Sequence, residues 1–180
     1  PMTLLSRKEF PANTFPELLD YVKKHQDKVS MAHAGIGAVS QLCSMLFMNQ
    51  IGVNLTTVPY KGAGPAMNDL LGDQTTQTVP VIQDGKRAKV FGVTTPKRLS
   101  SLPNIPTLDE QGLKGFDVKV WHGMYAAKGT PKEVIDKLNK ALNAALVDEN
   151  VKKRIAELSS DLVSADKATP ESLQRHLEAE

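Results

Sequence analysis

The 180-residue sequence predicts an α/β fold with a largely parallel sheet. Short apolar runs of strand type alternate with segments of helical spacing, and glycine or proline separates most of them. Capping boxes at Thr14–Glu17 and Thr130–Glu133 mark two helix starts, because the side chains of such a box satisfy exposed backbone N–H groups. From Pro131 onward the apolar residues keep the 3.6-residue period, so the last third of the chain is expected to be almost entirely helical.

The first half of the chain is expected to contain three strands and three helices. Residues 2–6 form a strand, and a helix with an apolar face follows Thr14. A strand at residues 28–32 runs into Gly35 and Gly37, and a helical run follows them with Leu42, Met45 and Leu46. A third strand at residues 53–59 leads into a second glycine loop and a further helix start.

The second half is expected to contain two strands and then helices. The strands lie at residues 88–95 and 116–127. Pro131 suits the first position of a long helix, Asp148 caps the next one, and Thr169 followed by Pro170 opens the last.

Composition excludes several classes of protein. Hydrophobic residues make up 41% of the chain and charged residues 23%, which is typical of a globular protein with a core. The net charge is only +2, the basic residues are scattered and aromatic residues make up 5%, so nucleic-acid binding is not expected. No apolar run approaches the roughly 20 residues that cross a bilayer.

Cys43 is the single cysteine of the chain. A disulfide within the chain is therefore impossible, and metal sites of the CxxC type are absent. Its place in a helical pattern beside Leu42 favours a small packed residue, with a reactive thiol as the alternative. We predict no metal site and no cofactor, since the spacing of a P-loop or of a dinucleotide fingerprint is also missing.

Two glycine loops carry the strongest local signal for function. The first is Ala34–Ser40 and the second is Tyr60–Ala66, and each follows a predicted strand and precedes a helix. Loops of this kind present unpaired backbone N–H groups at a helix N-terminus, where an anion binds. The side chains of Ser40 and Tyr60 add hydroxyl groups. The pair predicts a site for a carboxylate or a phosphate, and the alternative for each loop is ordinary turn chemistry.

A catalytic constellation is not visible in the sequence. His33 stands at a strand end beside the first loop and is the candidate for a general base, but no carboxylate is placed to orient it. His122 shows no ligand spacing, His25 and His176 are expected on polar helix faces, and the G-x-S-x-G turn of a serine nucleophile is absent. We therefore predict no catalytic residue and expect that the protein is not an enzyme.

Three longer motifs resemble a known family. They are VPYKGAGPAMNDLLG from Val58, GVTTPKRLSSLPNIPTLDEQG from Gly92 and FDVKVWHGMYAAKGTPKEVIDKLNKAL from Phe116. They look like the Bug/TctC solute receptors, the extracytoplasmic binding proteins of tripartite tricarboxylate transporters. The resemblance implies a type II periplasmic-binding-protein fold, in which two α/β lobes close by a hinge on a small mono- or dicarboxylate. It also implies a periplasmic location and membrane subunits of the transporter as partners.

The resemblance further implies an assignment of lobes and of ligand residues. Residues 1–115 correspond to the second lobe, and residues 116–180 to a hinge-crossing strand and helices of the first lobe. The ligand-binding positions carried over are Ala34, Gly35, Ile36, Gly37, Ala38, Ser40, Tyr60, Lys61 and Gly62, with Asp73 near the hinge.

The sequence also departs from the family pattern. The signal sequence and first glycine-rich loop of the family have no counterpart, so the chain reads as starting in mid-protein. Residues appear deleted where Gly72 joins Asp73, and Ala38 and Gln41 stand where the family often has Ser or Thr and His. Two rival hypotheses follow: a small α/β enzyme that acts on a carboxylated or phosphorylated metabolite with His33 as base, or a truncated receptor remnant with no high-affinity ligand.

Overall fold

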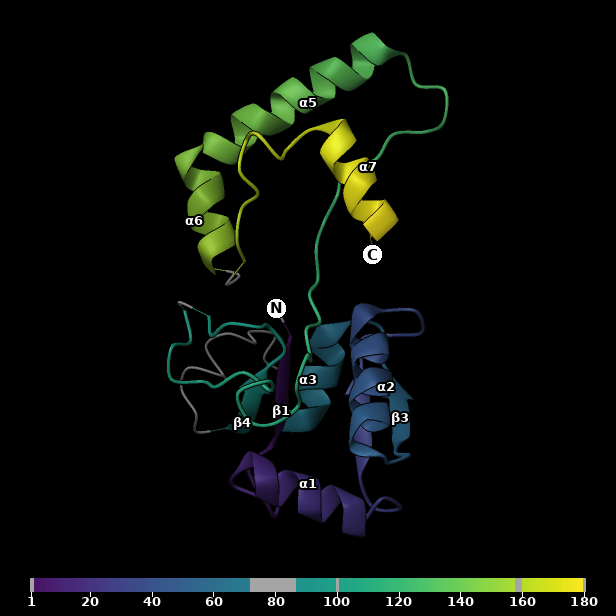
Figure 1. Cartoon of the computed structure of the whole chain (residues 1–180), viewed down its shortest axis with the longest axis vertical. Coiled ribbons are helices and arrows are strands. Elements are labelled where there is room, and N and C mark those ends of the chain that lie inside the picture. The colour runs from purple at the N-terminus through teal and green to yellow at the C-terminus, as the bar shows by residue number, and fades with distance from the viewer. Residues whose placement is uncertain (1, 72–86, 100, 158–159, 180) are drawn as a thin grey trace. The chain divides into compact units, whose positions relative to one another are not determined.

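A computed structural model describes residues 2–71, 87–99, 101–157 and 160–179. The chain forms two compact units, Pro1–Val120 (unit 1) and Trp121–Glu180 (unit 2), which are taken in turn below (Figure 1). In the described parts, no helix is both long enough and apolar enough to cross a membrane. Asp73 and the junction after Gly72 lie outside the described residues.

Unit 1 contains the strands and helices that carry the glycine loops. In chain order they are β1 (Thr3–Arg7), α1 (Phe15–Lys24), β2 (Ser30–His33), α2 (Val39–Ile51), β3 (Thr56–Pro59), α3 (Ala63–Leu71) and β4 (Ala88–Val93). Strands β2 and β3 pair in parallel, with Ser30 opposite Thr56 and His33 opposite Pro59. The helix between them, α2, contacts β2, as expected of a βαβ unit.

The prediction of a largely parallel sheet is wrong for the other strand pair. Strands β1 and β4 pair antiparallel, with Thr3 opposite Val93, and form a separate two-stranded sheet. Most of the unit lies between these two strands in the sequence, so no local connection fixes their direction. Their orientation is decided by tertiary packing, which the alternation of strands and helices does not encode.

The start of α1 follows the predicted capping box with one difference. The Thr14 hydroxyl oxygen accepts a hydrogen bond from the Glu17 N–H at 3.4 Å. The Glu17 carboxylate accepts from the N–H of Asn13 at 2.7 Å, one residue before the position that the box specifies.

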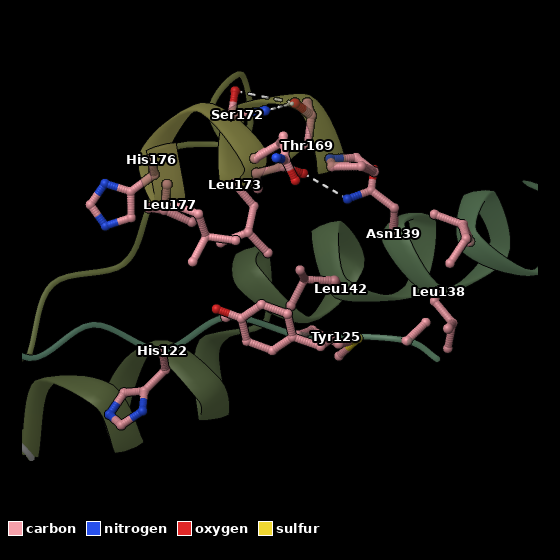
Figure 2. Close-up of a pocket in the computed structure, with 18 of the residues that line it drawn as sticks. His122, Tyr125, Leu138, Asn139, Leu142, Thr169, Ser172, Leu173, His176 and Leu177 are labelled. Carbon is pink, nitrogen blue, oxygen red and sulfur yellow. Dashed lines mark hydrogen bonds between the residues drawn. The ribbon is translucent and has the colours of Figure 1, made fainter. Parts of the chain in front are cut away.

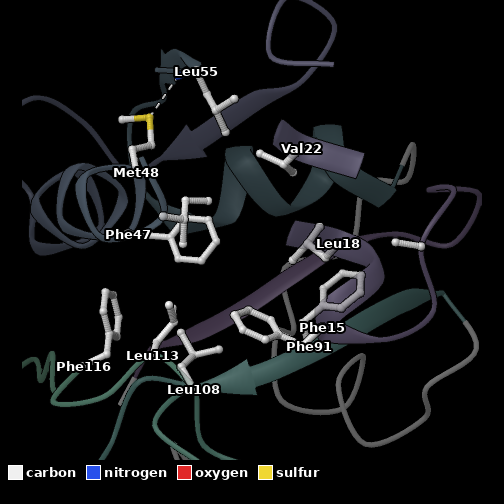
Figure 3. Close-up of a cluster of buried hydrophobic side chains, with 12 residues drawn as sticks. Phe15, Leu18, Val22, Phe47, Met48, Leu55, Phe91, Leu108, Leu113 and Phe116 are labelled. Atoms are coloured by element: carbon white, nitrogen blue, oxygen red, sulfur yellow. Dashed lines mark hydrogen bonds between the residues drawn. The ribbon is translucent and has the colours of Figure 1, made fainter. Parts of the chain in front are cut away.

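One hydrophobic cluster holds unit 1 together (Figure 3). Helix α1 contributes Phe15, Leu18 and Val22, and α2 contributes Phe47, Met48 and Ile51. The remaining members are Ala12 before α1, Leu55 just before β3, Phe91 in β4, and three residues of the loop after β4, Leu108, Leu113 and Phe116. Full burial of side chains of this size stabilises a fold by about 1.5–3 kcal/mol each.

The face of helix α2 that packs against this cluster is not the one that carries its three predicted apolar residues. Leu42, Met45 and Leu46 are each about half exposed. Cys43, by contrast, is partly buried against the cluster, and burial raises the pKa of its thiol to about 11. The thiol therefore stays protonated at neutral pH, which favours the packing role of Cys43 over a reactive one.

Unit 2 contains the helices α5 (Lys132–Val147), α6 (Glu149–Glu157) and α7 (Pro170–Ala179). The predicted caps at Asp148 and Thr169 are confirmed: Asp148 accepts from the N–H of Asn150 at 2.9 Å, and Thr169 accepts from that of Ser172 at 3.1 Å. The capping box at Thr130 is not formed, because the Thr130 hydroxyl donates to the carbonyl of Ala127 at 2.8 Å.

The predicted strand at residues 116–127 is wrong. This segment contains no strand, helix or turn. Within this segment, the Val118 N–H donates to the Thr94 carbonyl and the Val118 carbonyl accepts from the Thr94 hydroxyl. The sequence pattern shows a tendency to form a strand, but a strand also needs a neighbour, and none of the described strands pairs with this segment.

Candidate functional site

The two predicted glycine loops lie side by side in unit 1. Each follows the carboxyl end of one of the parallel strands, β2 or β3, and leads into a helix, α2 or α3. Two backbone bonds join them: the Tyr60 N–H donates to the His33 carbonyl and the Gly62 N–H donates to the Ala34 carbonyl, each at 2.9 Å. Ligands bind at this edge in open α/β sheets, so the loops stand where the sequence places a site.

Gly35 allows this close approach of the two loops. Its φ of +137° is a conformation that residues with a side chain rarely adopt. A Cβ atom at Gly35 would lie 3.2 Å from the Tyr60 carbonyl oxygen, closer than most such contacts.

Several predicted ligand donors are used inside the loops. The N–H of Ala34 donates to the Ser40 hydroxyl oxygen at 2.9 Å, and that of Gly37 donates to the Gln41 side chain at 2.7 Å. The Ala38 N–H donates to the Gly35 carbonyl at 3.2 Å. Together with the bonds from Tyr60 and Gly62, these contacts shape the loops and leave those five N–H groups without capacity for a ligand.

Six other backbone N–H groups have no partner among the described residues. Three belong to the first loop and the start of α2, and three to the second loop and the start of α3: Ile36, Val39, Ser40, Lys61, Ala63 and Gly64. The first turn of any helix leaves N–H groups unpaired and carries partial positive charge. The arrangement is therefore suited to accept the oxygen atoms of an anion.

Val39, Ala63 and Gly64 lie within the two predicted loops, but they are not among the individual ligand positions carried over from the family. The available signal was positional, because the first residues of a helix always leave their N–H groups unpaired. The motifs point instead to the glycines, and the N–H groups of three of these, Gly35, Gly37 and Gly62, are engaged within unit 1.

The Tyr60 hydroxyl is also engaged within the unit. It donates a hydrogen bond to the Asp69 carboxylate on α3, and this bond raises the pKa of Tyr60 above its usual value. The side chain of the neighbouring Lys61 is exposed.

His33 holds the first loop in place. Only 2% of its surface is exposed, and its Nδ1 atom lies 2.9 Å from the Gly35 carbonyl oxygen. The Gly35 nitrogen lies 3.3 Å from the same Nδ1 atom, so both backbone polar groups of Gly35 contact the ring. Among the described residues no carboxylate contacts the ring, which is the orienting partner that a catalytic base ordinarily needs.

No group of three or more potential metal ligands occurs within the described ranges. A hollow of about 910 Å³ lies in unit 2 (Figure 2), and no residue of either glycine loop lines it. What the loops offer a ligand is therefore mainly their unpaired backbone N–H groups.

Residues 1–175 match the model of the family described as "Tripartite tricarboxylate transporter family receptor", named TctC. The chain belongs to this receptor family. The match extends over both units and includes both glycine loops, so it confirms the family that the three sequence motifs indicated.

Individual relatives of the TctC receptors agree with this assignment. A UPF0065 protein of Agrobacterium vitis is 43% identical over 187 aligned positions, which cover 100% of this chain and 54% of that protein. The solved periplasmic binding protein BugD is 49% identical with a TM-score of 0.90, covering 98% of this chain and 61% of BugD. MatC from Rhodopseudomonas palustris, solved with bound malate, is 33% identical with a TM-score of 0.90, covering 98% of this chain and 62% of MatC.

These comparisons confirm the periplasmic-binding-protein fold of the TctC type. They also show that the chain spans about half of the A. vitis protein and about three fifths of the two solved receptors. The alignment to the A. vitis protein is longer than this chain, so that relative carries residues inside the match that this chain lacks.

Proposed function

We propose that the chain is a ligand-binding part of a periplasmic receptor that takes up a small carboxylate. The single observation that carries the proposal is the set of six unpaired N–H groups at the starts of α2 and α3. Backbone N–H groups of this kind stabilise a carboxylate by charge-assisted hydrogen bonds. Membership of the receptor family and the malate held by MatC support a carboxylate over a phosphate.

The proposed mechanism is closure of two lobes around the anion. Residues 1–115 would belong to the second lobe and residues 116–180 to the hinge crossing and the first lobe. The ligand would favour the closed state through contacts that only that state completes. The closed receptor would then deliver the carboxylate to the membrane subunits of a tripartite transporter. The family description supports this partnership.

We also propose that the chain binds its ligand without converting it. The rival hypothesis of an enzyme needs His33 as a base, but this ring is buried and bonded to the Gly35 carbonyl. The enzyme hypothesis predicts turnover that is lost in a His33→Ala variant. The receptor hypothesis predicts no turnover in either protein.

Val39 offers a direct test of backbone recognition. It is the first residue of α2, a position where proline is tolerated, and a Val39→Pro variant lacks one of the unpaired N–H groups. The preceding residue Ala38 already has the extended conformation that proline requires before it, with φ −71° and ψ 150°. Val39→Ala is the matched control, because it shortens the side chain and keeps the N–H group.

The measurement is calorimetric titration of the parent chain and both variants with malate, succinate, adipate and phosphate. We expect one dicarboxylate to bind the parent and Val39→Pro to weaken it about tenfold, since a hydrogen bond to a charged group contributes about 1.5–3 kcal/mol. Val39→Ala should bind within about threefold of the parent. Equal affinity in Val39→Pro would refute recognition by this group, and absence of any binding would favour the receptor remnant.

A further inference from the structure

The side chain of Gln41 turns back over the start of α2. Gln41 is the third residue of this helix, and its Oε1 atom accepts a hydrogen bond from the Gly37 N–H at 2.7 Å. A third-position side chain that reaches back in this way is common at helix starts. The amide group is therefore held at the same turn as Val39 and Ser40, whose backbone N–H groups have no partner among the described residues.

The bond from Gly37 fixes which end of the Gln41 amide is free. Because a backbone N–H only donates, the atom that it contacts is the carbonyl oxygen of the amide and not its nitrogen. The nitrogen, Nε2, is bonded to the same carbon atom, and it has no hydrogen-bond partner in the part of the chain that the structure describes. Its two N–H groups are thus available donors at the helix start, in addition to those of the backbone.

Side chains that could accept a hydrogen bond from a ligand are scarce in the two loops. Residues 34–41 and 60–66 contain no Asp or Glu, and their single charged side chain is Lys61, which is positive and exposed. The Ser40 hydroxyl oxygen already accepts from the Ala34 N–H, and the Tyr60 hydroxyl donates to Asp69 on α3. The groups that these stretches present to a ligand are therefore mainly N–H donors.

A set of N–H donors distinguishes anions by whether they carry a proton. Every oxygen atom of a fully ionised anion accepts hydrogen bonds, so all of the donors find partners. Phosphate keeps at least one proton at neutral pH, and its O–H group needs an acceptor that these side chains do not supply. A polar group left without its partner disfavours binding. Carboxylates and sulfate carry no proton at the same pH, so the donor set suits them better.

We propose that this site selects fully ionised anions, and that Gln41 sets the selection by donating hydrogen bonds from Nε2 to the anion. Gln41 then has two roles, because its oxygen holds Gly37 in the first loop while its nitrogen contacts the ligand. It is not among the ligand positions carried over from the family. The inference rests on the proposed function, since it concerns the same site, and it adds the protonation state by which a ligand is chosen.

Sulfate and phosphate are suitable probes, because both are tetrahedral and they differ in the proton. Each is titrated at neutral pH and constant ionic strength into the 180-residue chain labelled with nitrogen-15, and malate is titrated in parallel. We expect the NMR signals of the Gln41 side-chain amide and of the backbone amides of Ile36, Val39 and Ser40 to shift together. Sulfate should bind about tenfold more tightly than phosphate, because the O–H group of phosphate stays unpaired.

Two variants of Gln41 separate contact with the ligand from support of the loop. Gln41→Glu keeps an oxygen for the Gly37 N–H, but its second oxygen replaces the amide nitrogen, so it repels sulfate and accepts from the O–H of phosphate. We expect Gln41→Glu to lower the preference for sulfate about tenfold. Gln41→Leu loses the Gly37 contact and gains no acceptor, so both anions should bind more weakly while the preference changes less than about threefold.

Asn49→Asp is the matched control for the added negative charge. Asn49 is exposed and lies eight residues further along α2, away from both glycine loops. The change from an amide to a carboxylate is the same as in Gln41→Glu, but a charge at this distance is largely screened by salt. The affinities of Asn49→Asp for sulfate and phosphate should therefore equal those of the parent chain.

The results separate this inference from the proposed function. An unchanged preference in Gln41→Glu, or a Gln41 side-chain signal that no anion moves, would show that Gln41 only supports the loop. Equal affinity of the parent for sulfate and phosphate would overturn selection by protonation state, and malate binding would still support the receptor. A response to sulfate but not to malate would retain the selection and count against the carboxylate proposal. No response to any of the three anions would overturn both.

Discussion

Gly35 lies where the two glycine loops touch, and only a residue without a side chain fits there. Gly35→Ala is expected to lower the free energy of unfolding by about 1–3 kcal/mol, because φ +137° is strained for alanine and its Cβ would press on the Tyr60 carbonyl. The measurement is urea unfolding followed by circular dichroism. Gly37→Ala is the control: its φ is +77° and nothing lies within 4 Å of an added Cβ, so its loss should be smaller. Equal losses would contradict the close contact.

The hydrogen bond between Tyr60 and Asp69 can be detected by titration of the Tyr60 hydroxyl. The Tyr60 hydroxyl donates to the Asp69 carboxylate, so removal of its proton breaks the bond and brings two negative charges together. We expect Asp69→Asn to lower the pKa of Tyr60 toward its usual value of 10.0. Ultraviolet absorbance of the tyrosinate form measures this, with Tyr60→Phe identifying the signal. An unchanged titration curve in Asp69→Asn would show that the pair is not formed in solution.

At the scale of elements, the start of α1 is stabilised by Thr14. The Thr14 hydroxyl satisfies an N–H group of the first turn, so Thr14→Ala is expected to cost about 1 kcal/mol of stability. Urea unfolding gives this difference, and Thr14→Ser, which keeps the hydroxyl, should restore most of it. A Thr14→Ser variant as unstable as Thr14→Ala would contradict the capping role.

Glu17 at the same helix start makes part of this stability depend on pH. The Asn13 N–H donates to its carboxylate and holds the pKa of Glu17 below its usual value of 4.5. A carboxyl group whose pKa is lower in the folded state stabilises the fold above its unfolded pKa, and this contribution disappears as pH falls through the folded pKa. Glu17→Gln should therefore be less stable than the parent at neutral pH. The difference in stability between the two proteins should disappear in acid. Urea unfolding midpoints measured at neutral and at acidic pH test this, and the same difference at both would contradict it.

At the scale of the whole molecule, the two units differ in how much they bury. Unit 1 has a cluster of large buried side chains, whereas Ala168 is the only buried hydrophobic residue in the described part of unit 2. We expect backbone amides of α5, α6 and α7 to exchange with solvent much faster than those of α1 and α2. Phe47→Ala should cost about 3–5 kcal/mol in unit 1 and leave exchange in unit 2 unchanged. Uniform protection across the chain, read by hydrogen-exchange mass spectrometry, would contradict this.

The helix caps predicted from sequence are confirmed at three of four positions, and the box at Thr130 is not formed. Caps at Thr14, Asp148 and Thr169 depend on residues within one turn of each other, and the structure confirms them. The prediction failed for the strand at residues 116–127, because pairing depends on a neighbour elsewhere in the fold. The helical spacing of Leu42, Met45 and Leu46 identified a helix but not the face that packs. The positions of β2 and of the loop after β4 decide which face of α2 is buried.

The sequence by itself determined the family, the α/β class and the place of the two glycine loops, since motifs and turn residues record short-range requirements. Only the tertiary structure decided which backbone N–H groups remain available at those loops. The contact between the two loops uses the N–H groups of Tyr60 and Gly62, which donate to the carbonyls of His33 and Ala34. The tertiary structure also decided the antiparallel pairing of β1 with β4, because contacts between distant residues depend on how the whole chain packs.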